Sequence, residues 1–234
     1  DAKTIWKFKN DLAETETVDK LFCMFDEHLE KEGLISHKGT IVDAPRQRNS
    51  RDENKKIKNG VIPEEWEKPE NKSKLAQKDI DADWTKKNGE RHFGYKDHVK
   101  CDADSKLITN YSVTSASVHD SQRCLVFIGQ EDEVLYADSA YSGKPIALAL
   151  PENCKNQICE KGYRNSPLTS EQKMNNRRKS RIRCRIEQIF GFMTGAMHGI
   201  TIRSIGITRA WMNIGITNLV YNFCRYSYLK RASA

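Results

Sequence analysis

The stretch Val134-Leu135-Tyr136-Ala137-Asp138-Ser139-Ala140-Tyr141-Ser142-Gly143 joins a short apolar run to one acidic residue, small residues and a glycine. The run predicts a short buried strand whose last residue is Asp138. Open α/β sheets carry their functional groups just beyond the carboxyl ends of strands, so a carboxylate at this position can take part in chemistry. The sequence therefore predicts an α/β protein with Asp138 at a functional site.

Two further acids follow related patterns. The β-prone run 39–44 ends with Asp43 and Ala44, and Pro45 is expected to halt regular structure there. A helix is predicted over 177–195, because apolar residues recur at helical spacing at Ile182, Ile186, Ile189, Phe190 and Met193. This helix would place Glu187 on the flank of its apolar stripe, one turn from Arg183.

Three acids at such positions can bind two divalent cations. Carboxylate oxygens suit Mg²⁺ or Mn²⁺, and a metal pair can activate a hydroxyl and stabilise the leaving oxygen of a phosphoryl transfer. Each acid also has a structural explanation: Asp138 can cap a helix, Asp43 can be a turn residue, and Glu187 can pair with Arg183. Spacing alone leaves both interpretations open.

Positive charge gathers in the C-terminal third of the chain. The net charge of the 234 residues is +7, but residues 161–234 carry 14 Lys and Arg against two acids, Glu171 and Glu187. A solvated helix face would explain part of this excess. The asymmetry favours a polyanionic partner such as nucleic acid.

The composition also indicates the compartment. No apolar run approaches the roughly 20 residues needed to span a bilayer, and the first residues lack the layout of a signal peptide. Seven scattered cysteines suit reduced thiols in a reducing compartment, and no zinc site is predicted at Cys154 and Cys159. We expect a cytoplasmic protein with no membrane association.

The remaining elements follow from periodicity and turn signals. Further helices are predicted over 2–32, over 144–150, over 205–230, and from a cap at His119-Asp120-Ser121 to about 128. Strands are predicted over 92–101 and 107–117, as a hairpin, and around 157–159. Residues 46–91, with 13 bases and 10 acids, are predicted to form a long charged insertion with short helices.

Taken together, these motifs resemble a known family. The matching runs are Thr4-Ile5-Trp6, Ile41-Val42-Asp43-Ala44, Pro45-Arg46-Gln47-Arg48-Asn49, Phe93-Gly94-Tyr95-Lys96, Val118-His119-Asp120, Tyr136-Ala137-Asp138-Ser139-Ala140-Tyr141, Arg183 with Glu187-Gln188-Ile189-Phe190-Gly191, and Arg203-Ser204-Ile205-Gly206. The chain is similar over nearly its whole length to DDE transposases of the bacterial insertion sequence five family.

The resemblance implies an RNase H-like mixed sheet flanked by helices. It also implies Mg²⁺ held by Asp43, Asp138 and Glu187, and cleavage of double-stranded DNA at the ends of a mobile element followed by strand transfer into target DNA. Arg183 matches the family's arginine ahead of the glutamate. DNA contacts are expected at Arg183, Arg178, Arg181, Arg185, Lys144 and Lys100. We expect a homodimer on DNA, associated with the bacterial nucleoid.

The chain departs from the family pattern at several points. Ser180 and Thr194 stand where the family usually has tyrosine and lysine, and Asp43-Ala44 abuts Pro45 with no residues between them. We expect the helical region that precedes Thr4 in the family to be largely absent, leaving a helical lead-in over 1–37 and a catalytic domain over 38–234. An alternative prediction is a truncated, catalytically inactive transposase derivative that still binds DNA.

Overall fold

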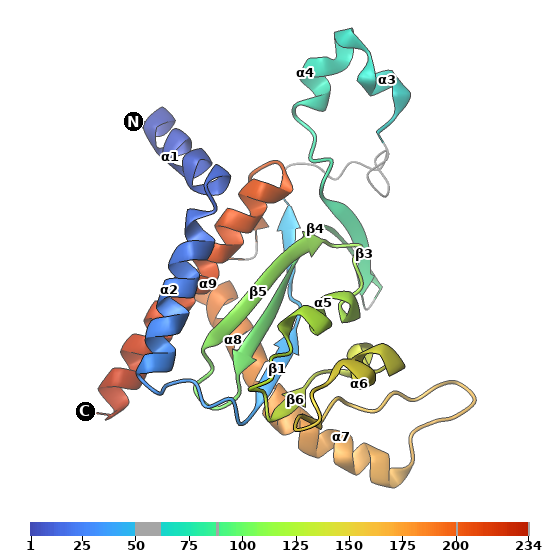
Figure 1. The fold of residues 1–234 in the computed structure, drawn as a ribbon. Coiled ribbons are helices and arrows are strands. Elements are labelled where there is room, and N and C mark those ends of the chain that lie inside the picture. The colour runs from blue at the N-terminus through green and yellow to red at the C-terminus, as the bar shows by residue number, and fades with distance from the viewer. Residues whose placement is uncertain (50–61, 88, 200, 234) are drawn as a thin grey trace.

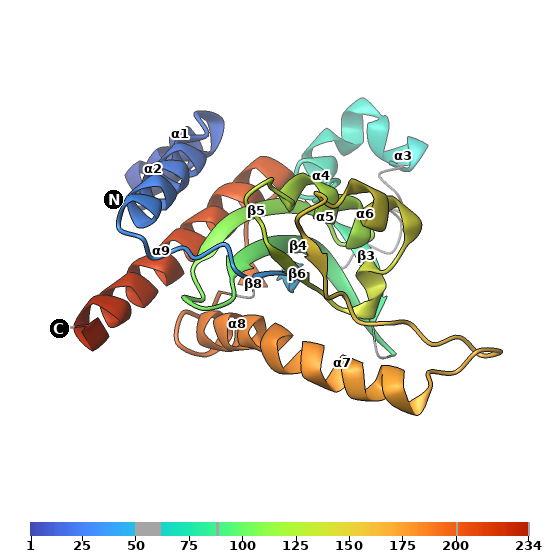
Figure 2. The same ribbon diagram turned by 60° about the horizontal axis from the view of Figure 1, so that its bottom comes forward.

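The fold is built on one mixed sheet with helices on both of its faces (Figures 1 and 2). The computed structural model describes residues 1–49, 62–87, 89–199 and 201–233. Residues 50–61 of the predicted charged insertion lie outside this part. The predicted α/β class, a mixed sheet flanked by helices, is confirmed.

The described helices are α1 (Ala2–Glu14), α2 (Thr17–Lys31), α3 (Glu64–Glu67), α4 (Lys72–Leu75), α5 (Ser121–Phe127), α6 (Lys144–Ala149), α7 (Ser170–Arg183), α8 (Arg185–Gly195) and α9 (Ile207–Ser233). Short 3-10 turns lie at Pro69–Asn71 and Ser139–Tyr141. The described strands are β1 (Thr40–Asp43), β2 (Arg46–Asn49), β3 (Asp83–Lys87), β4 (Glu90–Asp102), β5 (Ile108–Ser115), β6 (Val134–Tyr136), β7 (Lys155–Asn156) and β8 (Thr201–Ile202).

The strand order places the two predicted aspartates together. Across the sheet, β5 is antiparallel to β4 and β4 to β1, whereas β6 is parallel to β1 and β7 to β6. In the parallel pair, Thr40 lies beside Leu135 and Ile41 beside Tyr136. The same offset, continued beyond the end of β6, sets Asp43 beside Asp138. Parallel strands thus bring both acids to one edge of the sheet.

Pro45 interrupts regular structure as predicted, but only over Ala44 and Pro45, because β2 begins at Arg46. Asp43 lies opposite Val99 of β4, and three residues later Arg46 lies opposite Lys96, so β1 and β2 follow β4 in one unbroken register. Pro45 is tolerated because its carbonyl still accepts a hydrogen bond from the amide of Asp97. After this short interruption, β2 therefore continues the line of β1 beyond the acid.

Each face of the sheet has its own core. Ile41 of β1 packs in a cluster with Ile186 and Ile189 of α8 and Ile214 of α9. The next residue, Val42, points the other way into a cluster under α5 and α6. Burying each such side chain stabilises the fold by roughly 1.5–3 kcal/mol. The predicted stripe of α8 is confirmed, and it fixes this helix against the sheet.

Helix α9 buries polar as well as apolar side chains. Met212 and Leu219 are buried, whereas Val220 and Phe223 are exposed, and Asn218 and Asn222 are buried beside the sheet. The side chain of Asn222 bonds both the amide and the carbonyl of Ile108. The amide of Asn222 thus satisfies backbone groups of β5, and the amide of Asn218 donates to the carboxylate of Asp97 on β4, so polar residues occupy positions that hydropathy assigns to solvent.

Several predicted boundaries need correction. The helix over 2–32 is two helices, broken where Glu16 adopts a left-handed conformation with φ of 52°. The helix over 177–195 begins earlier and is broken at Cys184 into α7 and α8. Strands β2 and β3 lie inside the predicted charged insertion, together with the short helices expected there. The strand expected around 157–159 lies two residues earlier as β7, and β6 ends two residues before Asp138.

The polar side of β4 is buried rather than solvated. Lys96, His98 and Lys100 are each less than a tenth exposed. Asp120 does not cap α5 with its side chain; instead, its carboxylate lies 2.8 Å from the amine of Lys96. The predicted cap is therefore wrong, because a buried lysine requires an acidic partner.

Two general expectations can also be compared with the structure. All seven cysteines are free, and Cys154 and Cys159 are both buried. In the part of the chain that the structure describes, no helix combines the length and the apolar character needed to cross a membrane.

Candidate active site

A cleft of about 650 Å³ opens where β1 and β6 end. Its lining combines acidic, basic and apolar side chains: Asp43, Ala44, Pro45, Arg46, Arg48, Glu90, His92, Asp138, Arg183, Glu187 and Phe190. The three acids predicted from the sequence share this one cleft. Asp43 is the last residue of β1, Asp138 follows the neighbouring strand β6 by two residues, and Glu187 comes from the first turn of α8.

Arg183 links two of these acids. Its Nη1 donates to Oδ2 of Asp43 at 3.2 Å, and its Nη2 donates to Oε1 of Glu187 at 2.8 Å. Burial lowers the pKa of Arg183, but Asp43, Glu187 and Asp138 outweigh burial and raise it. The guanidinium therefore supplies positive charge to all three carboxylates, through direct contacts with two of them.

The break at Cys184 makes this contact possible. Arg183 is the last residue of α7, and Glu187 lies in the first turn of α8. The amide of Glu187 bonds the carbonyl of Cys184, which closes the turn between the two helices. Because α8 is held by its apolar stripe, this turn presents both side chains to the end of β1.

The structural explanations of the three acids also hold. Oδ1 of Asp138 caps the turn at Ser139–Tyr141 by accepting from the amide of Ala140 at 2.7 Å, and Oδ1 of Asp43 accepts from the amide of Ala44 at 2.8 Å. Glu187 pairs with Arg183 four residues before it. These contacts orient the carboxylates without removing them from the cleft, since one oxygen of Asp138 and one of Glu187 take no part in them.

The donor set suits a hard divalent cation. Three carboxylates from rigid elements converge on one cleft, and oxygen ligands are those that Mg²⁺ and Mn²⁺ prefer. Among the described residues, the three acids are not drawn together within 4.8 Å as a ready-made cluster. Instead, Arg183 stands between Asp43 and Glu187. A cation entering here would take over carboxylate oxygens that Arg183 now holds.

A second group of possible ligands has a structural role. His37, Glu131 and Asp132 bring ligand atoms within 4.8 Å of one another. However, Lys100 already lies 2.9 Å from Oδ2 of Asp132 and 3.6 Å from Glu131. The other oxygen of Asp132 accepts from the hydroxyl of Thr40 at 2.6 Å. Lys100 therefore neutralises negative charge in this group, and both oxygens of Asp132 have hydrogen-bond donors within the protein.

This cluster corrects the prediction for Lys100. Its side chain is 8% exposed and its amine is held by the buried carboxylate of Asp132, so it cannot reach a DNA backbone. Lys100 belongs to the fold. Helix α5 packs against β4, and the loop after it carries the Asp132 that holds this lysine.

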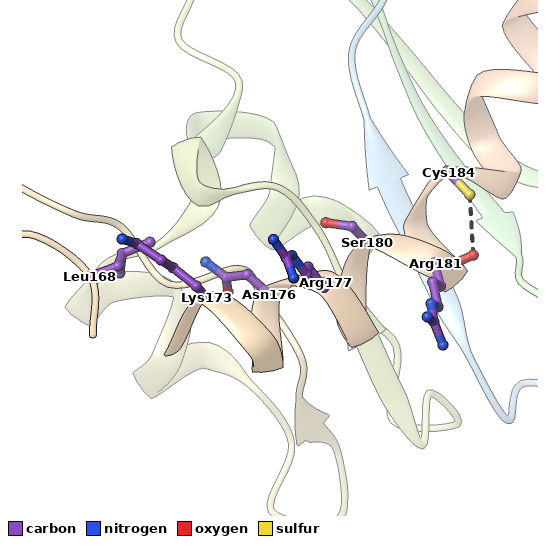
Figure 3. A pocket seen from close by; sticks show the side chains of 7 residues that line it. All are labelled: Leu168, Lys173, Asn176, Arg177, Ser180, Arg181 and Cys184. Atoms are coloured by element: carbon purple, nitrogen blue, oxygen red, sulfur yellow. Dashed lines mark hydrogen bonds between the residues drawn. The ribbon is translucent and has the colours of Figure 1, made fainter. Parts of the chain in front are cut away.

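Helix α7 carries the densest positive charge. Its 14 residues include six Lys and Arg, a single acid and no buried side chain. A hollow of about 600 Å³ runs along this helix. Lys173, Arg177 and Arg181 line it beside the uncharged polar groups of Asn176 and Ser180 (Figure 3). The helix is held in place by a capping box at its start. It therefore presents fixed cations to solvent.

The other predicted DNA contacts have different surroundings. Arg178 is exposed on α7, and Lys144 is exposed at the start of α6. Arg185 is tied to the hairpin turn, with Nη1 2.7 Å from the carbonyl of Ala103 and 3.0 Å from Asp104. Sequence reasoning did not select Lys173 or Arg177, although both belong to the basic run.

Arg46 and Arg48 were also missed as cleft residues. They were included in the charged insertion, but both lie on β2. The signal available was the alternation of arginine at positions 46 and 48 directly after Asp43, which suits a strand.

The sheet and the cleft define a class of protein. Three antiparallel strands, two further strands parallel to the first, and acids at the ends of the central pair are the arrangement of an RNase H-like domain. The chain belongs to the DDE transposase family, because the model of the transposase DDE domain matches residues 35–223. This confirms the resemblance to DDE transposases and is consistent with the insertion sequence five grouping.

A curated relative agrees with this assignment. The chain is 29% identical over 199 residues to the transposase for insertion sequence element IS1106 from Neisseria meningitidis serogroup B. The match covers 79% of this chain and 64% of the relative. No solved structure matches the chain significantly.

Proposed function

We propose that this chain cleaves DNA at the ends of a mobile element and joins the freed ends to target DNA, with Asp43, Asp138 and Glu187 as its catalytic acids. One observation carries the proposal: the three acids line a single cleft at the ends of adjacent strands. Bound Mg²⁺ or Mn²⁺ would polarise the scissile phosphate and lower the pKa of an attacking hydroxyl.

The three acids and Arg183 have different roles in the proposed reaction. Asp43 and Asp138 are fixed by the sheet, and backbone amides orient one oxygen of each. Glu187 is 57% exposed, so its side chain has room to adjust when ligands bind. Arg183 keeps like-charged carboxylates from repelling one another, since its guanidinium lies between two of them. The rigid pair and the adjustable third acid together suit metal binding.

A cleavage assay with metal removal tests this proposal. The substrate is duplex DNA taken from the genomic sequence that flanks the gene, incubated with protein and Mg²⁺ or Mn²⁺. We expect cleavage with either ion and none after EDTA, because carboxylates alone cannot supply the missing positive charge. Salt-dependent DNA binding with no cleavage under any of these conditions would instead favour the inactive, DNA-binding alternative.

The exposed face of α7 is the proposed path of the DNA backbone. Lys173, Arg177 and Arg181 stand at successive turns of α7 and line a shared hollow, a spacing suited to consecutive phosphates (Figure 3). The same helix ends at Arg183 in the cleft. A strand bound along α7 would therefore lead to the three acids. We also propose that two copies act together on DNA, because transposition joins two ends.

Replacing Arg178 and Arg181 together by glutamine is expected to weaken DNA binding. Loss of two phosphate contacts should lower the slope of log affinity against log salt by about 2 and reduce affinity about 10- to 100-fold near 0.15 M salt. Fluorescence anisotropy over a salt series measures both. The matched control, Lys7→Gln with Lys9→Gln on exposed α1, removes equal charge. Equal losses in the two double variants would contradict a specific path along α7.

A further inference from the structure

Three cations meet at the turn that joins β4 and β5, residues 103–107, which lies beside α8 and α9 (Figures 1 and 2). Lys106 belongs to the turn, Arg185 is the first residue of α8, and Arg225 lies on α9. All three are partly exposed. Burial lowers the pKa of Lys106, and the neighbouring charges of Arg225 and Arg185 lower it further. The folded chain therefore brings three like charges together within reach of solvent.

Neutral groups hold these cations in place. The amine of Lys106 donates to Oε1 of Gln188 at 2.6 Å. Nη1 of Arg185 and Nε of Arg225 donate to main-chain carbonyls of the turn at 2.7 and 2.6 Å. The guanidinium of Arg225 also lies 5.0 Å from the centre of the Tyr228 ring. These contacts fix the positions of the cations without neutralising their charge.

The acids of the turn offset little of this charge. Asp104 lies 3.0 Å from Nη1 of Arg185, but its side chain is 63% exposed, and exposed ion pairs are weak. The carboxylate of Asp102 is buried and accepts hydrogen bonds from Ser36 and Ser105. Within the described part of the chain, neither Lys106 nor Arg225 pairs with a carboxylate. An anion from outside would therefore be stabilised here.

Helix α8 connects this turn with the catalytic cleft. Glu187 lines the cleft, whereas the next residue, Gln188, meets Lys106 at the turn. Gly191 follows Glu187 by four residues and Gln188 by three, so it lies beside both of them on the helix surface. It is exposed, and a Cβ added there would meet nothing within 4 Å. A DNA backbone can therefore pass closely over α8, whose diameter is roughly 10–12 Å.

We infer that Lys106, Arg185 and Arg225 bind a phosphate of the DNA backbone, across α8 from the catalytic acids. This inference rests on the proposed function and gives the duplex a second contact besides α7. The phosphate supplies the negative charge that the turn lacks and relieves the repulsion among the three cations. Because neutral acceptors already hold these side chains, little ordering is required when DNA binds.

Lys106→Gln in the whole chain tests the site, because glutamine removes the charge and its amide can still donate to Gln188. The slope of log affinity against log salt should fall by about 1, and affinity for the duplex used for cleavage should fall about 3- to 10-fold near 0.15 M salt. Tm should not fall, since the substitution removes a repelled charge. The matched control is Lys20→Gln on α2, where an exposed lysine also donates to a neutral acceptor, the carbonyl of Thr15. It should change neither the slope nor Tm.

Lys106→Glu provides the second variant. Its carboxylate would lie beside Arg185 and Arg225 in place of the phosphate, so Tm without DNA should rise while DNA affinity falls a further 3- to 10-fold or so, about as much again as in Lys106→Gln. A slope for Lys106→Gln equal to that of the parent, or a lower Tm in either variant, would overturn the phosphate site. Cleavage by the parent with no effect of Lys106→Gln on affinity would overturn the site alone. The expected changes in binding without any cleavage would keep the site and overturn the proposed catalysis.

Discussion

Asp138→Asn is expected to reduce metal-dependent DNA cleavage by about 10³-fold or more while leaving DNA affinity and Tm close to those of the parent. Asparagine has nearly the same shape, and its amide oxygen can still accept from the amide of Ala140, so the turn after β6 should keep its cap. The negative charge is lost, however. Removing one anionic metal ligand forfeits several kcal/mol of transition-state stabilisation, which corresponds to this loss in rate.

The measurement is the initial rate of cleavage of end-labelled duplex in Mg²⁺ and in Mn²⁺, with anisotropy and thermal unfolding on the same preparations. Asp11→Asn, an equivalent change on the exposed part of α1, serves as the control and should cleave like the parent. If the Asp138→Asn variant cleaves at a rate near that of the parent, Asp138 is not a catalytic acid and the assignment of the cleft is wrong.

Lys100→Met is expected to destabilise the protein by about 3–5 kcal/mol without directly affecting DNA contacts. The change leaves the carboxylate of Asp132, 1% exposed, without the amine that now lies 2.9 Å away. An uncompensated buried charge is among the most destabilising features that a single substitution can create. Urea unfolding followed by circular dichroism measures the loss.

A double variant separates lost charge balance from lost volume. Adding Asp132→Asn to Lys100→Met removes the stranded charge, and the hydroxyl of Thr40 can still donate to the amide oxygen. We expect the pair to recover more than half of the stability lost by Lys100→Met alone. If Lys100→Met instead retains full stability and binds DNA weakly, the original expectation of a DNA contact at Lys100 is restored.

The primary sequence contains the chemistry of the candidate site. Asp43 and Asp138 both follow β-prone runs, and the stripe before and after Glu187 predicts the helix that carries this acid. Local patterns suffice here because burial of one face dictates period two in strands and period 3.6 in helices. The basic run was equally visible, since charge density needs no tertiary context.

Other features depend on which surfaces come together. Lys100 looks exposed until α5 and its loop cover β4, and Arg46 looks like part of an insertion until β2 continues the register of β1. Arg183 contacts both Asp43 and Glu187 only because α7 and α8 meet beside the end of β1.

The sequence by itself therefore determined the fold class and the family and selected the three candidate acids, because these depend on short-range patterns. Only the tertiary structure decided which lysine and arginine side chains are exposed and which are paired with acidic groups inside the protein. The physical reason is that the fate of a charge is set by its neighbours in space, through burial and pairing over a few ångströms. Residues such as Lys100 and Asp132, 32 positions apart, acquire that neighbourhood only when the chain has folded.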